Sequence, residues 1–146
     1  MKISLGSDHG GFIYKEAIAR HLRDNGYEVI DCGTYSLDSC NYASFGIAAA
    51  KKVASKEADF GILVCTSGEG ISIAANKVRG IRCGIGYNDT VSELLRVHNN
   101  ANMISFGAKY MELDDVLRRV DIFLNTNFEG GRHEARVQTI INEENY

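Results

Sequence analysis

Short apolar segments alternate with amphipathic helical segments along the chain, and this order restricts the possible fold more than any other feature. Apolar runs of strand length predict strands over residues 2–6, 27–31, 59–64, 81–86 and 102–106. Helical periodicity predicts helices over residues 12–25, 44–56, 71–77, 89–98 and 112–125, and a last helix that begins near residue 131. This alternation is typical of βαβ units, so we expect an α/β fold: a three-layer, Rossmann-like open sheet of about five parallel strands with helices on both faces.

The helical pattern also predicts which side chains face the core. In the first helix, one stripe carries Ile13, Tyr14, Ala17, Ile18 and Leu22. A second stripe in the fifth helix carries Leu113, Val116, Leu117, Val120 and Leu124.

The length of the chain suits one compact unit. A chain of 146 residues with 45% hydrophobic residues predicts a single domain over 1–146. The formal net charge of -3, without a block of Lys or Arg, argues against nucleic acid or a membrane as partner and favours a small molecule. No apolar run approaches the roughly 20 residues that span a bilayer, and no signal peptide is recognisable, so we expect a cytoplasmic protein.

Four cysteines are present, but their spacing predicts neither disulfides nor a zinc site. Cys32 and Cys83 lie after and within predicted strands, where a small buried apolar role is the usual one. Cys65 differs because it begins the loop Cys65-Thr66-Ser67-Gly68-Glu69-Gly70, which leads into a helix. The positive N-terminal end of that helix suits a thiolate or a bound anion.

Chemically active residues follow several predicted strands. Ligands of open parallel sheets bind outside the carboxyl ends of the strands, so these residues should share one edge. The segments concerned are 7–11 with Asp8 and His9, the Cys65 loop, 87–89, and 107–109 with Lys109. Gly68-Glu69-Gly70 lacks the third glycine of a dinucleotide-binding loop, and the lysine of a P-loop is missing, so nicotinamide and ATP sites are disfavoured.

Three further features of the sequence each allow two interpretations. The polar segment 32–42 is either an active-site loop or a long connection. His98 and Asn99 end the fourth helix at the opposite, amino edge of the sheet, so His98 is either a helix cap or part of a site completed by another subunit. Arg132 and Arg136, four residues apart, either hold a phosphate or lie on a solvated helix face.

Four motifs in order resemble one family. They are SDHGG at 7–11, GILVCTSGEGISIAANK at 61–77, RVHNNAN at 96–102 and EGGRHEAR at 129–136. Over nearly its whole length the chain resembles the ribose-5-phosphate isomerase B family, which includes the galactose-6-phosphate isomerase subunits. The resemblance implies isomerisation of a phosphorylated sugar through a cis-enediolate without cofactor or metal, most simply ribose 5-phosphate to ribulose 5-phosphate.

The resemblance also implies roles for individual residues. The catalytic ones would be Cys65 as proton carrier, Ser67 beside the enediolate, His98 as the ring-opening residue from a partner subunit, and Asp8 on the sugar. The substrate-binding ones would be His9, Tyr42, Gly68, Gly70, Asn99, Lys109, Arg132 and Arg136, with the N–H groups of 67–70 holding the enediolate oxygens. A homodimer with composite sites follows, with a tetramer as a larger option.

This sequence departs from the family pattern at a few positions. A second branch of the family uses a glutamate base at a position that is Ile71 here, so Glu69 is not that base. Lys109 replaces a usual arginine, Asn41-Tyr42-Ala43 replaces Asp-Tyr-Pro, and Glu69 adds a carboxylate to the loop. These changes keep two alternatives open: isomerisation of a six-carbon phosphate such as allose or galactose 6-phosphate, and a non-catalytic sugar-phosphate binding module.

Overall fold

Five parallel strands form one sheet in the order β2-β1-β3-β5-β4 in the computed structural model, which describes residues 1–144. The strands are β1 (Lys2–Ser7), β2 (Glu28–Asp31), β3 (Phe60–Cys65), β4 (Cys83–Ile85) and β5 (Met103–Gly107). The helices are α1 (Phe12–Asp24), α2 (Tyr42–Ala54), α3 (Glu69–Asn76), α4 (Asp89–Val97), α5 (Leu113–Leu124) and α6 (Arg132–Glu143). The predicted fold class is confirmed.

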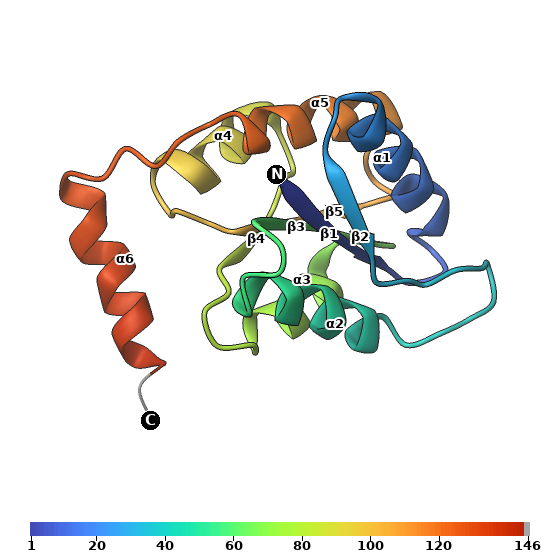
Figure 1. The fold of residues 1–146 in the computed structure, drawn as a ribbon, viewed down its shortest axis with the longest axis horizontal. Coiled ribbons are helices and arrows are strands. Elements are labelled where there is room, and N and C mark those ends of the chain that lie inside the picture. Colours follow the sequence, from blue (N-terminus) through green and yellow to red (C-terminus); the bar gives the residue numbers. More distant parts are fainter. Residues whose placement is uncertain (145–146) are drawn as a thin grey trace.

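Helices cover both faces of the sheet. Figure 1 shows α1, α4 and α5 on one face and α2 and α3 on the other. Strand residues alternate between these faces, so Ile62 and Val64 pack with α1 and α5 while Leu63 and Cys65 pack with α2 and α3. Cys65 therefore points to the α2/α3 side of the sheet.

Three elements, α2, α3 and β4, have a boundary that lies two or more residues from the prediction. Helix α2 begins at Tyr42 instead of residue 44, because the side chain of Asn41 accepts a hydrogen bond from the N–H of Ala43 at 2.9 Å and caps the helix. Helix α3 begins at Glu69, inside the segment predicted to be loop. Strand β4 spans three residues, 83–85. At its start, the N–H of Ile81 donates to the carbonyl of Val78 and that of Arg82 to the side chain of Asn102, whereas at its end the N–H of Gly86 still donates to Ser105 of β5.

The predicted core stripe of α1 is partly wrong. Ile13 is 62% exposed, whereas Lys15 is 1% exposed and lies beside Ile18 and Leu22 on the buried face. The Lys15 ammonium is paired with Asp31 at 2.7 Å, which makes its burial possible. Periodicity could not predict this, because the partner carboxylate comes from β2. The predicted stripe of α5 agrees with the buried Val116, Val120 and Leu124.

Helix α6 stands apart from the three layers (Figure 1). Two of its side chains, those of His133 and Val137, are buried, whereas Ile140 is 50% exposed. Near its end, Glu144 accepts a hydrogen bond from the N–H of Gly80 at 2.9 Å. No helix in the described part of the chain has both the length and the apolar character needed to cross a membrane.

Candidate active site

Cys65 ends β3 at the point where the loop to α3 begins. Its side chain is 4% exposed, and its Sγ accepts a hydrogen bond from the backbone N–H of Gly68 at 3.1 Å. Gly68 is the N-cap of α3, so the sulfur also lies at the partially positive end of that helix. A hydrogen-bond donor and the positive end of a helix thus both face the sulfur, the atom that would act as a base or nucleophile.

The same loop determines which backbone donors are free for a ligand. The N–H of Gly68 is used by Cys65, and the N–H of Glu69 donates to Ser67 Oγ at 3.2 Å. Within residues 1–144, the N–H groups of Ser67 and Gly70 have no protein acceptor. The predicted group of four donors is thus reduced to two, because the other two already stabilise the loop.

Two glycines allow this loop to pack directly on β5. Gly68 has a φ of +83°, and a Cβ there would lie 2.9 Å from the carbonyl carbon of Phe106. A Cβ at Gly107 would overlap the backbone of Ser67. The hydroxyl of Ser105 donates to the carbonyl of Gly68 at 3.0 Å and holds the two segments together. The position of the Cys65 thiol is therefore determined by close backbone packing.

Asp8 and His9 follow β1 and adjoin the Cys65 loop. Asp8 is 6% exposed, and its Oδ1 accepts the N–H of Gly11 at 3.0 Å, which shapes the turn. A Cβ at Gly10 would lie 2.5 Å from the hydroxyl oxygen of Thr66, so the two loops are in close contact. The prediction that the segments after β1 and β3 meet at one edge is confirmed.

The segment after β2 reaches the same edge through a contact that sequence analysis missed. The N–H of Cys40 donates to Nδ1 of His9 at 3.3 Å. Because Nδ1 accepts this hydrogen bond, the neutral ring carries its proton on Nε2, which is then a donor. Of the two interpretations of the polar segment, the structure therefore favours a loop that borders the site.

Tyr42 and Gly70 lie against each other. A Cβ at Gly70 would come within 2.7 Å of the Tyr42 ring, so glycine is needed for this approach. The next residue, Ile71, is fully buried against Gly46 of α2. Position 71 is thus part of the core, which agrees with its apolar identity.

Lys109 follows β5 and its backbone N–H donates to the carbonyl of Thr66 at 3.1 Å. Its exposed side chain lines a pocket of about 350 Å³ together with Gly10, Ile13 and Thr66. The pocket places an ammonium group beside the loops that carry Asp8 and Cys65. Ile13, predicted to be in the core, forms part of its wall instead.

Glu69 lies in the first turn of α3, where a carboxylate interacts favourably with the helix dipole. Its exposed side chain lines a separate pocket of about 640 Å³ with Ser67, Tyr87 and Tyr110. The carboxylate that Glu69 adds to the loop therefore lies where it stabilises the start of the helix.

A second group of predicted site residues gathers at the end of α4. His98 is the C-cap of α4 and lines a pocket of about 310 Å³. The other predicted residues around this pocket are Asn99, Arg132 and Arg136. Arg132 and Arg136 are exposed and one helical turn apart, as their spacing predicted.

His133 joins this group without having been predicted. Its imidazole stacks on that of His98, with ring centroids 4.2 Å apart and planes 20° apart, and Nε2 lies 3.4 Å from a carboxylate oxygen of Glu129. The side chain is 8% exposed. Burial lowers the pKa of His133, and the neighbouring His98 and Arg132 side chains lower it further. The EGGRHEAR motif contains this histidine, but no sequence signal indicates that it stacks on a ring 35 positions earlier.

The two groups occupy opposite edges of the sheet. Helix α4 starts after the carboxyl end of β4, with Asn88 as its N-cap, and ends at His98, shortly before β5 begins at Met103. His98 thus lies at the amino edge, whereas Cys65 ends its strand at the carboxyl edge. One chain alone does not bring these two residues together, in agreement with the predicted placement of His98.

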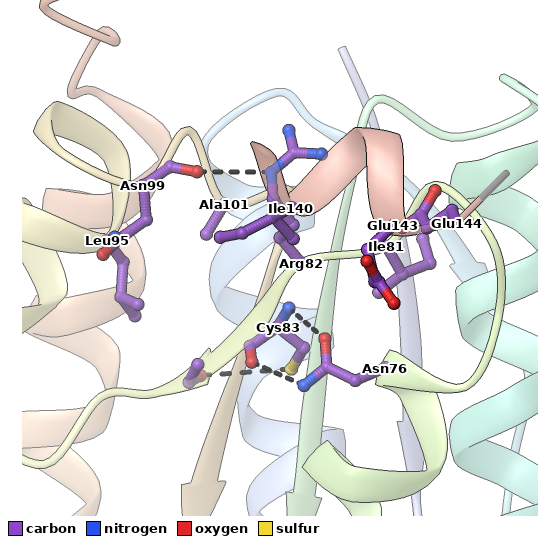
Figure 2. Close-up of a pocket in the computed structure, with 11 residues that line it drawn as sticks. Asn76, Ile81, Arg82, Cys83, Leu95, Asn99, Ala101, Ile140, Glu143 and Glu144 are labelled. Carbon is purple, nitrogen blue, oxygen red and sulfur yellow. Dashed lines mark hydrogen bonds between the residues drawn. The ribbon is translucent and has the colours of Figure 1, made fainter. Parts of the chain in front are cut away.

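A fourth hollow lies between α6 and the edge strand β4, with a volume of about 460 Å³ (Figure 2). Its wall includes Ile140 and Leu95, and Asn76 forms two hydrogen bonds of 2.8 Å with the backbone of Cys83. Burial raises the pKa of Cys83 to about 12, so this thiol stays protonated at neutral pH. Burial also raises the pKa of Cys32. Both are consistent with structural roles.

Similarity to known proteins extends over nearly the whole chain. Residues 3–140 match the Ribose/Galactose Isomerase family model. Ribose-5-phosphate isomerase B of Escherichia coli K12 is 44% identical over 139 residues, covering 95% of this chain and 93% of that protein. The structure of the Clostridium thermocellum ribose-5-phosphate isomerase B is 47% identical with a TM-score of 0.98, covering 99% of this chain and 98% of that one.

A further solved relative carries a bound sugar. Ribose-5-phosphate isomerase B from Mycoplasma genitalium, with bound ribulose 5-phosphate, has a TM-score of 0.95 and 36% identity over 99% of this chain and 96% of its own. Identity at this level over nearly the whole of both chains, joined to the same arrangement of strands and helices, shows common descent. The chain belongs to the ribose/galactose isomerase family.

Proposed function

We propose that this protein is a sugar-phosphate aldose–ketose isomerase that interconverts ribose 5-phosphate and ribulose 5-phosphate. The observation that carries the proposal is the Cys65 thiol, held by the Gly68 N–H at the N-terminus of α3 beside two free backbone donors. The names of the relatives and the ribulose 5-phosphate bound to the Mycoplasma protein support this substrate. We place the enzyme in the cytoplasm, where phosphorylated sugars are interconverted, with residues 1–146 acting as one domain.

Cys65 acts as the proton carrier. Its thiolate removes the proton from C2 of the open-chain aldose and leaves an enediolate with negative charge shared by the C1 and C2 oxygens. The N–H groups of Ser67 and Gly70 and the Ser67 hydroxyl stabilise that charge. Returning the proton to C1, with transfer of the hydroxyl proton from the C2 oxygen to the C1 oxygen, completes the ketose without a redox cofactor or a metal ion.

A homodimer completes each site. His98, Asn99, Arg132 and Arg136 lie at the amino edge of the sheet, so they join the Cys65 group when two chains pair about a two-fold axis. His98 of the partner subunit then opens the sugar ring, and the two arginines hold the phosphate with His9 and Lys109. Asp8, Tyr42 and Asn99 contact the sugar.

A direct assay tests the reaction. Purified protein converts ribose 5-phosphate to ribulose 5-phosphate, and treatment with a chelator leaves the rate unchanged. Cys65→Ala abolishes turnover but keeps sugar-phosphate binding, measured as thermal stabilisation by the substrate. Full activity in Cys65→Ala would remove Cys65 from the mechanism. Stabilisation without turnover in the wild type would instead identify a binding module.

A mixing experiment tests the shared site. Cys65→Ala and His98→Asn chains are inactive as separate homodimers, but a heterodimer of the two contains one intact composite site. Refolding them together should restore up to about half of the activity in each heterodimer. The absence of activity in heterodimers verified by mass spectrometry would contradict a site built from two chains. Sedimentation of the wild type separates a dimer from a tetramer.

A six-carbon substrate is the second candidate, because the family model covers galactose isomerases and Asn41-Tyr42-Ala43 departs from the usual loop. Asn41 nevertheless caps α2 through the N–H of Ala43, a hydrogen bond that a proline at 43 could not donate. The first turn of α2, which carries Tyr42, is therefore still held in place despite the changed loop. Because Tyr42 is proposed to contact the sugar, this favours the five-carbon substrate. Values of kcat/KM for ribose, allose and galactose phosphates decide between the two.

A further inference from the structure

Three potential metal ligands meet where the His98 pocket adjoins the segment before α6. One donor atom each from His98, Glu129 and His133 lies within 4.8 Å of the other two. His98 ends α4, whereas Glu129 and His133 come from the segment before α6 and its first turn. The sequence spacing did not indicate a metal site, because the fold brings His98 to the other two residues.

The geometry of two of these ligands already suits a tetrahedral metal ion. Nε2 of His133 lies 3.4 Å from the carboxylate oxygen of Glu129. Two ligand atoms bound tetrahedrally to Zn²⁺ at about 2.0–2.1 Å are separated by about 3.3 Å. Glu129 and His133 could therefore bind one ion with little movement.

His98 needs a rotation to join them. Its ring is stacked on His133 with planes 20° apart, so the ring nitrogens do not yet converge on one point. Among the described residues, no side-chain hydrogen bond holds the half-buried His98 ring in this orientation. A change of side-chain torsion angle is enough to direct one of its nitrogens at the same ion.

The charges around the group make Glu129 essential for a cation. A histidine binds a metal ion through a neutral ring nitrogen and so brings no charge to offset that of the cation. Arg132 and Arg136 line the same pocket and repel a cation. The Glu129 carboxylate supplies the opposing negative charge. Replacing the Glu129 carboxylate by an amide removes this negative charge. It should therefore weaken metal binding more than the loss of one of three ligands alone would.

We propose that His98, Glu129 and His133 form a binding site for a divalent transition metal, best matched by Zn²⁺, and that the bound ion inhibits the isomerase. The binding part does not depend on the proposed function. The inhibitory part rests on the role proposed for His98, because an imidazole nitrogen bound to a metal cannot exchange a proton with the sugar ring.

Calorimetric titration of the reduced, full-length protein with Zn²⁺ tests the binding. We expect one ion per chain in the wild type, and binding more than about 100-fold weaker in Glu129→Gln and His133→Asn, beyond the loss typical of outer-shell changes. Glu134→Gln, which alters a neighbouring carboxylate of α6 outside the group, is the matched control and keeps wild-type binding. Equal zinc binding in all four proteins would overturn the proposal.

Co²⁺ as a spectroscopic probe locates the ion. Tetrahedral cobalt bands without a thiolate charge-transfer band support the histidine and carboxylate ligands, whereas a thiolate band would assign the metal to a cysteine and overturn the proposal.

For the inhibitory part, Zn²⁺ should stop wild-type turnover, a chelator should restore it, and Glu129→Gln should turn over ribose 5-phosphate in the presence of Zn²⁺. Zinc bound at the site without inhibition would contradict the inhibitory part and the role of His98. A wild type without isomerase activity would contradict the proposed function while the calorimetric result still decides the site.

Discussion

The backbone N–H of Gly68 donates a hydrogen bond to Sγ of Cys65 at 3.1 Å, and Gly68 itself adopts a left-handed conformation with φ of +83°. Its Cα faces the backbone of Phe106 and Gly107, where a side chain has no room. The environment of the thiol thus depends on a residue that has no side chain.

Replacing Gly68 by Ala should impair both stability and activity. The left-handed conformation alone costs about 1–2 kcal/mol for a residue with a Cβ, and the contact with β5 adds strain. Displacement of the loop by about 1 Å should lower kcat on the order of 100-fold. Gly26→Ala is the control, because Gly26 has a similar φ of +85° with open space around it. Gly26→Ala should lower the free energy of unfolding, measured in urea, by a similar conformational amount but keep the wild-type kcat. An equal loss of kcat in both variants would show that the effect of Gly68 is not local.

Lys15→Met should destabilise the fold by about 3 kcal/mol, because it leaves Asp31 without its buried partner. Asp31 is 22% exposed, which places the loss at the lower end of the range for buried pairs. Adding Asp31→Asn should restore at least about 1 kcal/mol. Lys52→Met, which removes an exposed pair with Glu57, should cost less than about 1 kcal/mol. Urea unfolding of the three variants and the wild type measures these differences, and equal losses for Lys15→Met and Lys52→Met would argue against a buried pair.

Stability should fall at mildly acidic pH through His133. The folded state lowers the pKa of this histidine, so the unfolded chain binds its proton more readily. The contribution of His133 is present above the unfolded value near 6.5 and is lost as pH falls through it toward the folded value. Thermal unfolding from pH 8 to pH 5 should therefore show a smaller decrease for His133→Asn than for the wild type. Parallel curves would contradict the assignment.

Two asparagines cap helices through their side-chain oxygens, but they lie at different distances from the predicted sugar pocket. Asn41 accepts the N–H of Ala43, and Asn88 accepts the N–H of Val91 at 2.7 Å. Replacing either by Ala should cost about 1 kcal/mol of unfolding free energy. Only Asn41→Ala should also raise KM for the sugar phosphate several-fold, because Tyr42 is the first residue of the capped helix. Equal KM values would indicate that this helix end does not position the sugar.

Much of the site could be predicted because position along a parallel sheet is encoded locally. Each residue that follows a strand must lie at the carboxyl edge, so Asp8, Cys65 and Lys109 could be grouped from their sequence positions. The direction of α4 similarly placed His98 at the other edge. These inferences need no knowledge of side-chain packing.

Other features depended on contacts between segments far apart in the chain. The burial of Lys15 needs Asp31, the tautomer of His9 needs the N–H of Cys40, and the stacking of His98 needs His133. None of these pairs leaves a periodic signal, because periodicity reports which face of one element is buried and not what lies opposite.

The sequence by itself determined the order of elements, the edge at which each candidate residue lies and the family, since alternation and motifs are properties of contiguous residues. The tertiary structure decided the rest. It showed which N–H groups of the Cys65 loop are free, that Glu69 sits at a helix end, and that Glu129 and His133 adjoin His98. The physical reason is that hydrogen bonds and charge interactions act over a few ångströms in space, whatever the separation of the residues along the chain.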